Sequence, residues 1–204
     1  MSDSNSFYLK RLMSITGMLP LGGFLLQHLF SNSYIFTSDH AFNEHSEFLT
    51  SLPLVYLIEG GMIYLPILLH AVFGLAIIYK GQNNFTSYGK FRNWMFFFQR
   101  LTGFVALGFI ATHSYTTRIS SVIYGTEMSA AVMRQTLAQP FWFWFYLVGI
   151  LSAVFHFSNG LWSFLITWGI TIGKKSQQMT SAVTMGLFVV MALWSVSILL
   201  KFVS

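Results

Sequence analysis

Five long apolar runs limit how this chain can fold. Each run is close to, or longer than, the roughly 20 residues that a helix needs to cross a bilayer. Only 8% of the 204 residues are charged, against roughly 25% in an average soluble domain. We therefore predict an all-α integral membrane protein, a single domain of residues 1–204 with five transmembrane helices. The expected helices span about 12–30, 54–79, 94–119, 141–172 and 182–202.

Local features refine this expectation. Pro20 lies inside the first run, where a proline removes a backbone hydrogen bond and bends the helix. The fourth run is longer than a bilayer requires, so it should tilt or extend beyond the membrane. Residues 31–52 include three acidic residues and no Lys or Arg. We expect this stretch to be a polar loop in which His40 and His45 are solvated.

Eight basic residues gather at one set of helix ends and three at the other. Cytoplasmic loops are enriched in Lys and Arg, so this asymmetry predicts a cytoplasmic N-terminus and an outside C-terminus. The short clusters also argue against a nucleic-acid partner, which would need the cations on one face or stripe. The majority set is Lys10, Arg11, Lys80, Lys90, Arg92, Arg100, Lys174 and Lys175, and the minority set is Arg118, Arg134 and Lys201.

One histidine lies inside each of the first four runs. An ionisable group at membrane depth costs a few kcal/mol unless something satisfies it, so it marks a functional site by default. His28 and His113 lie near the outer ends of helices that run outward. His70 and His156 lie deeper, toward the cytoplasm, in helices that run inward. Depth therefore pairs His28 with His113 and His70 with His156.

Paired histidines suit haem iron. The chain has no cysteine, which excludes thiolate-held iron-sulfur clusters and covalent haem attachment through Cys-x-x-Cys-His. Two neutral imidazoles in a bundle interior can bind an iron from both sides. A tetrahedral zinc site would need three or four ligands at one depth. Histidines that only pack, or that relay protons with further carboxylates, are the remaining alternatives.

Glycines recur around these histidines. Gly74 and Gly160 each follow a histidine by four residues, one turn away on the same helix face. Thr-Gly pairs that end in Gly17 and Gly103 precede the histidines of the first and third runs. A glycine beside a histidine admits a flat macrocycle, but glycines also let membrane helices approach closely.

Glu59 is the one carboxylate just inside the expected outer boundary. It precedes His70 by 11 residues, close to three helical turns, so both should project from one face. Its position fits a proton donor or acceptor at a quinone pocket. The alternative is a carboxylate that reaches to the membrane interface.

Seven strings along the chain resemble one family: the di-haem cytochrome b subunit of menaquinone-linked succinate dehydrogenases and, more distantly, of fumarate reductases. The resemblance covers nearly the whole chain. The strings are Phe-Tyr-Leu-Lys-Arg-Leu, Phe-Leu-Leu-Gln-His-Leu, Leu-Pro-Ile-Leu-Leu-His-Ala-Val-Phe-Gly, Arg-Asn-Trp, Gln-Arg-Leu-Thr-Gly, Phe-His-Phe-Ser-Asn-Gly-Leu-Trp-Ser-Phe and Thr-Trp-Gly-Ile-Thr.

The resemblance implies two noncovalent haems b enclosed by the first four helices. It assigns the outer haem iron to His28 and His113 and the inner one to His70 and His156. It also implies an FAD-containing flavoprotein subunit and an iron-sulfur subunit on the cytoplasmic face of a bacterial membrane, with menaquinone as acceptor. The quinone residues do not carry over, because the fumarate reductases have an acidic residue where this chain has Val154.

The preferred interpretation is a membrane anchor and electron-transfer subunit, reactive with quinone and without a dicarboxylate site of its own. One alternative is a di-haem cytochrome b that serves formate dehydrogenase or hydrogenase. The other, from a different class, is a haem-free membrane anchor or transporter.

Overall fold

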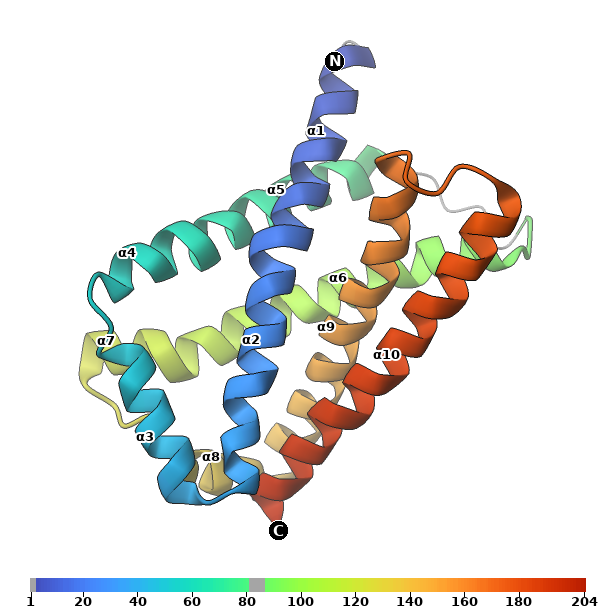
Figure 1. Cartoon of the computed structure of the whole chain (residues 1–204). Coiled ribbons are helices and arrows are strands. Elements are labelled where there is room, and N and C mark those ends of the chain that lie inside the picture. The colour runs from blue at the N-terminus through green and yellow to red at the C-terminus, as the bar shows by residue number, and fades with distance from the viewer. Residues whose placement is uncertain (1–2, 81–86) are drawn as a thin grey trace.

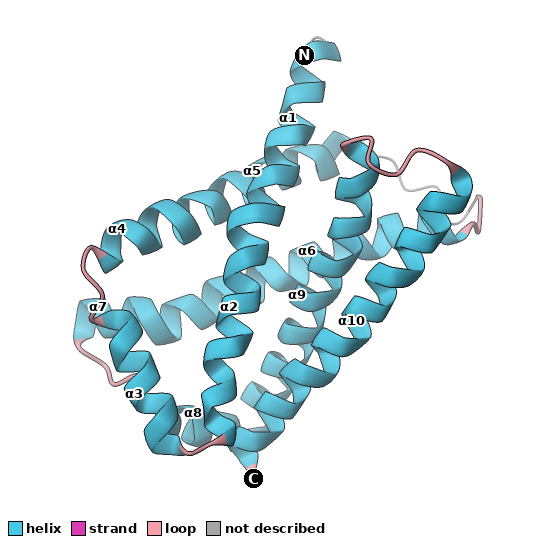
Figure 2. Ribbon diagram, in the orientation of Figure 1, coloured by secondary structure: helices cyan, strands magenta, loops and turns pink. Residues whose placement is uncertain are grey.

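The computed structural model describes residues 3–80 and 87–204. Throughout these two ranges every regular element is helical (Figure 2). Five stretches are long and apolar enough to cross a membrane, which confirms the predicted all-α class with five such helices. These candidate spans are Phe7–Phe36, Val55–Tyr79, Phe91–Tyr124, Pro140–Thr167 and Lys174–Val203.

The first three spans each contain one π-helical turn, and the last two are continuous α-helices. The elements of the spans are α1 (Asp3–Thr16), η1 (Gly17–Leu21), α2 (Gly22–Asn32), α4 (Val55–Glu59), η3 (Gly60–Tyr64), α5 (Leu65–Lys80), α6 (Phe91–Ser114), η4 (Tyr115–Ile119), α7 (Ser120–Tyr124), α9 (Pro140–Thr167) and α10 (Lys174–Val203). The shorter elements are the 3₁₀ turn η2 (Ser33–Phe36) and the helices α3 (Asp39–Thr50) and α8 (Ala130–Leu137).

Two of the π-turns occur next to prolines. Pro20 lies in η1, and Pro66 follows η3 by two residues. A proline lacks the N–H and its ring crowds the carbonyl four residues earlier. A π-turn adds one residue to the turn, which relieves that crowding. The first span therefore continues through Pro20, with Thr16 and Gly22 both in the α-helical region of the backbone map.

The stretch 31–52 is helical where we expected a loop. Ser38 has an extended backbone and its Oγ accepts from the N–H of Ala41 (3.0 Å), which caps the start of α3. His40 is exposed, as expected, and lies 3.3 Å from Glu44. The expected solvation of His45 is wrong. Its ring stacks on Tyr34 at 4.0 Å between centroids, and its Nε2 lies 3.0 Å from Ser31 Oγ.

The ends of α9 and α10 differ from the expected bounds. α9 ends at Thr167, before the expected 172, because Gly169 adopts a φ of +69°. The N–H of Ile170 then donates to the carbonyl of Leu165 (2.9 Å), as in a glycine-terminated helix. α10 begins at Lys174, before the expected 182, since residues 174–181 contain neither glycine nor proline.

The two termini lie at opposite ends of the bundle (Figure 1). We call the end with the start of α1 and the α9–α10 loop the N-terminal end. The other, C-terminal end carries α3, α7, α8 and Ser204. α9 packs between α6 and α10, and α1 packs on α5. Several fully buried side chains, such as Val154 and Met191, lie along α9 and α10, whereas many large apolar side chains face outward.

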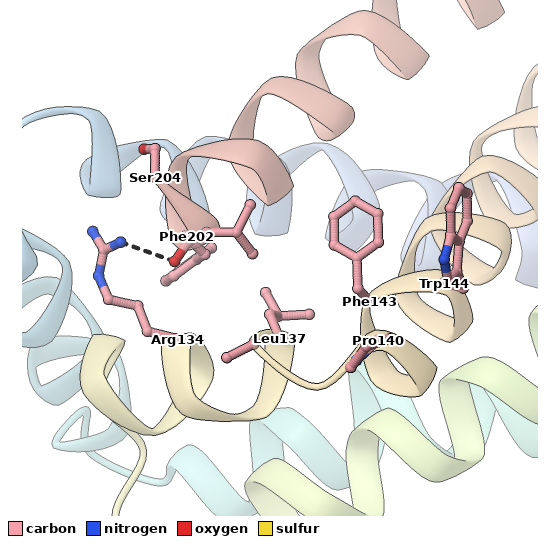
Figure 3. A pocket seen from close by; sticks show the side chains of 9 residues that line it. Arg134, Leu137, Pro140, Phe143, Trp144, Phe202 and Ser204 are labelled. Carbon is pink, nitrogen blue, oxygen red and sulfur yellow. Dashed lines mark hydrogen bonds between the residues drawn. The ribbon is translucent and has the colours of Figure 1, made fainter.

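Arg134 in α8 ties the C-terminal end together. Its Nη1 donates to the carbonyls of Lys201 (3.1 Å) and Phe202 (2.8 Å), in the last turn of α10 (Figure 3). Such carbonyls have no partner inside their own helix. Its Nε and Nη2 donate to the two carboxylate oxygens of Asp39. The hydrogen bond from Arg134 lowers the pKa of Asp39, and the same bond raises the pKa of Arg134.

Candidate functional site

The four histidines of the first four spans meet in two pairs. The rings of His28 (α2) and His113 (α6) have centroids 5.8 Å apart and planes at 71°. The rings of His70 (α5) and His156 (α9) have centroids 6.0 Å apart and planes at 87°. These are the two pairs that we predicted from depth. We call them the outer and the inner pair, respectively.

The inner pair is oriented by two backbone carbonyls. His70 Nδ1 lies 2.9 Å from the carbonyl oxygen of Met13, and His156 Nδ1 lies 2.9 Å from that of Gln99. A carbonyl oxygen only accepts, so each Nδ1 carries a proton and donates it. Each Nε2 is then the unprotonated nitrogen, the form in which a histidine binds a metal.

A glycine follows each of these carbonyls by four residues. A Cβ built on Gly17 would overlap the His70 ring, and one on Gly103 would lie 2.9 Å from Cε1 of His156. The repeated Thr-Gly pairs therefore admit the rings of the inner pair, although in sequence they precede the histidines of the outer pair. Gly160 instead borders Gln99, and a Cβ on Gly74 would meet nothing within 4 Å.

The outer pair is held by aromatic side chains that the sequence did not single out. Nδ1 of His113 lies 3.2 Å from the hydroxyl of Tyr146 in α9. The ring of Phe109 stacks on His113 at 5.5 Å and 15°. A Cβ on Gly149 would overlap that phenyl ring, so the glycine makes room for it. The four-residue spacing of Phe109 and His113 was the one available signal.

The two pairs occupy different levels of the bundle. His156 lies against Gly103, and His113 follows Gly103 by ten residues on α6. Ten residues correspond to about 15 Å along an α-helix. A metal ion held by one nitrogen from each ring would need the ring centres about 6 Å apart, because a metal–nitrogen bond to histidine is about 2 Å. Both pairs fit this requirement.

Glu59, which we predicted to lie just inside the outer boundary, has a charged partner. Arg118 Nε donates to its Oε1 over 2.7 Å, and the two side chains are only 18% and 17% exposed. From the sequence alone, Arg118 served only to predict topology. The turn η3 lies between Glu59 and His70, so the three-turn register that we expected from a regular α-helix does not hold.

Comparisons with known proteins agree with this architecture. The family model described as the succinate dehydrogenase/fumarate reductase transmembrane subunit matches residues 82–196. The chain belongs to this family. It is also 41% identical over 203 residues to the succinate dehydrogenase cytochrome b558 subunit of Bacillus subtilis (strain 168), covering all of both chains. The sequence motifs had predicted a cytochrome b membrane subunit of the succinate dehydrogenase/fumarate reductase family, and that prediction is thereby confirmed.

The position that departs from the fumarate reductases is buried in this family member. Val154 has no exposed surface and belongs to the apolar core beside α10. A carboxylate there would lack both water and an evident partner. A group that hands protons to a quinone would therefore have to lie elsewhere in the bundle.

Two surface cavities lie away from the histidine pairs. One, of about 560 Å³, is at the C-terminal end and is lined by Arg134, Phe143 and Trp144 among others (Figure 3). The other, of about 660 Å³, is at the N-terminal end and includes Arg11 and Trp168. Neither is lined by any of the four paired histidines or by Glu59.

Proposed function

We propose that this family member is the di-haem cytochrome b subunit of a menaquinone-reducing succinate dehydrogenase. It would anchor the flavoprotein and iron-sulfur subunits to the bacterial membrane and carry electrons through two haems b to quinone. The observation that carries the proposal is the meeting of two histidine pairs at two levels, each about 6 Å apart. The Bacillus subtilis relative is a succinate dehydrogenase cytochrome b558 subunit, which supports the proposal.

The chain's own residues would fix the iron ligands. When bound, a haem supplies reversible one-electron chemistry of its iron. The carbonyls of Met13 and Gln99 hold the tautomer and direction of the inner pair. Tyr146 and Phe109 hold one ring of the outer pair.

The basic residues support placing the N-terminal end in the cytoplasm. On that placement, electrons enter at the N-terminal end, near the inner pair, and move outward. When an electron moves outward across a membrane potential of 100 mV, inside negative, its free energy falls by about 2.3 kcal/mol. This drive would assist reduction of a low-potential quinone. Two levels of haem are useful only if electrons must cross the membrane.

The iron-sulfur subunit would dock at the same end. Lys90 and Arg92 are exposed beside the start of α6. The start of α1 projects beyond the other helices there (Figure 1). The side chain of Lys80, which we had grouped with these cations, lies outside the described residues. Arg100 lies over the Phe96 ring at 4.1 Å. Exposed cations of this kind contribute little individually, so docking would depend on several together.

Glu59 is proposed to pass protons to the quinone near the outer pair. Reduction of one quinone takes two electrons, supplied by succinate, and two protons, and it forms two O–H bonds. The hydroxyl of Tyr64 lies 3.1 Å from Oγ of Ser114, the neighbour of His113. This contact lies between the Glu59–Arg118 pair and the outer pair along the two spans. Polar groups thus continue from the carboxylate toward the outer pair.

Haem counting tests the proposal. The purified complex should give two haems per chain in a pyridine haemochrome assay. Replacing His70 or His156 by Ala should remove one haem, and replacing His28 or His113 should remove the other. A single haem in the unaltered protein, or loss of the same haem from His28 and His70 variants, would overturn the proposal.

Glu59→Gln should keep both haems but slow electron delivery to quinone. An unchanged rate of quinone reduction from pH 6 to 9 would show that Glu59 does not pass protons to the quinone.

A further inference from the structure

Arg118 and Glu59 form a mostly buried ion pair at the C-terminal end of the bundle, inside the second and third spans. The guanidinium carbon of Arg118 also lies 5.5 Å from the ring centroid of Tyr56. A guanidinium with a carboxylate on one nitrogen and an aromatic ring on its face is held in one orientation. Its charge is already balanced by Glu59.

One nitrogen of this guanidinium lacks an acceptor. Nη2 of Arg118 is buried, and no residue that the structure describes accepts a hydrogen bond from it. A buried donor without an acceptor is costly, especially when it is charged. Arg134 at the same end shows the contrast. Each of its three nitrogens donates, to the Asp39 carboxylate or to carbonyls at the end of α10.

The unused donor lies near the outer pair. Arg118 follows His113 by five residues, within the turn η4. π-turns of this kind are frequent at functional sites. The Tyr64–Ser114 contact joins the second and third spans one turn deeper. The geometry thus offers a fixed N–H donor just inside the membrane boundary, at the level where electrons would leave the outer pair.

We propose that Arg118 Nη2 binds a carbonyl oxygen of the quinone headgroup. This inference rests on the proposed function, which brings quinone to this end. A neutral acceptor suits the site better than a second carboxylate, because Glu59 already balances the charge. The N–H donor stabilises the negative charge that collects on the oxygen as the quinone takes up electrons. Glu59 keeps the guanidinium in place and lies beside the same oxygen for proton transfer.

Arg118→Lys in the intact complex tests this assignment. Lysine keeps the charge beside Glu59 but removes the forked pair of nitrogens. With a short-chain 1,4-naphthoquinone as acceptor, the KM for quinone should rise about 10- to 100-fold, the loss expected of one hydrogen bond from a charged donor. Haem content and the reduction of both haems by succinate should not change. Arg134→Lys is the matched control, and its KM should stay at the unaltered value.

The outcomes separate this inference from the function on which it rests. If Arg118→Lys leaves the KM unchanged while Glu59→Gln slows quinone reduction, the outer site stands and the role of Arg118 is wrong. If neither variant has an effect and Arg11→Gln raises the KM, quinone reacts at the N-terminal end and both ideas fail. If the Arg118→Lys complex does not assemble, the assignment is tested by infrared spectroscopy of the unaltered complex. Bound naphthoquinone with ¹³C-labelled carbonyls should show a lowered C=O stretch by infrared difference spectroscopy, and an unshifted band overturns the assignment.

Discussion

Gly103→Ala should weaken the inner haem site selectively. The new Cβ would lie 2.9 Å from Cε1 and 3.1 Å from Nδ1 of His156. The ring must therefore move away from α6, and its 2.9 Å hydrogen bond to the carbonyl of Gln99 would stretch or break. Because Met95, Gln99 and Gly103 share one face of α6, the helix itself cannot yield without disturbing the Asn159 contacts.

The expected loss of haem-binding free energy follows from three effects. Overpacking of a fitted interior costs about 1–3 kcal/mol, and a lost hydrogen bond costs about 1 kcal/mol. Alanine in place of a helical glycine returns about 1 kcal/mol. The net loss is about 1–3 kcal/mol, which corresponds to a 5- to 150-fold weaker haem site because 1.4 kcal/mol is about tenfold.

Gly108→Ala on the same helix is the control, because a Cβ there meets nothing within 4 Å. Haem per complex is measured by pyridine haemochrome during dilution against a haem-binding protein, with spectra after reduction by succinate. Gly103→Ala should lose one haem faster and be reduced more slowly by succinate, while Gly108→Ala should match the unaltered protein. Two haems with equal retention and equal spectra in both variants would refute the idea that Gly103 makes room for the His156 ring.

The remaining predictions address other parts of the chain. Gly149→Ala should displace Phe109 from His113 and alter the spectrum of the outer haem alone, whereas Gly186→Ala, with open space around it, should not. The Asp39–Arg134 contact should hold α10 in place above the ordinary Asp pKa of about 3.9 and be lost as pH falls through the lowered pKa of Asp39. Proteolysis of the C-terminus at stepped pH measures this, and Asp39→Asn should remove the pH dependence. Neutralising Lys90 and Arg92 together should weaken assembly with the iron-sulfur subunit, and unchanged copurification and haem reduction by succinate would contradict that role.

The histidine pairs could be predicted from the sequence because depth depends only on the count of residues along each helix. The rise per residue is constant, so the levels of His28 and His113 relative to flanking charges follow directly. The five spans could be predicted for a similar reason, since their length and composition are set by the bilayer. Helix ends outside the apolar runs could not be predicted in this way. The start of α10 at Lys174 depends on backbone compatibility rather than on hydrophobicity.

The partners of the histidines could not be predicted, because they depend on the rotation of each helix about its axis. The carbonyl of Met13 carries no side-chain signal, and the π-turn η1 that follows it shifts the register of the first span. The pairing of Arg118 with Glu59 has the same origin, since η3 and η4 both change the direction of these side chains. The depth of each histidine along its helix could be predicted from the sequence, but the direction of its side chain around the helix axis could not.

The repeated local arrangement gives the Thr-Gly pairs a physical meaning. The first and third spans repeat one arrangement: a carbonyl is followed after three residues by a threonine and then by a glycine. The carbonyl accepts a hydrogen bond from a histidine of the next span, and the glycine leaves room for the ring of that histidine. Thr16 Oγ1 donates to the carbonyls of Leu12 and Met13, and Thr102 Oγ1 donates to those of Phe98 and Gln99. Each threonine therefore shares the carbonyl that accepts from the imidazole. The acceptor is a main-chain carbonyl, which a side-chain substitution does not remove. The glycine is therefore the position at which a new side chain can disrupt the site. Each Thr-Gly pair therefore makes room for the histidine of the following span, and not for the histidine of its own span.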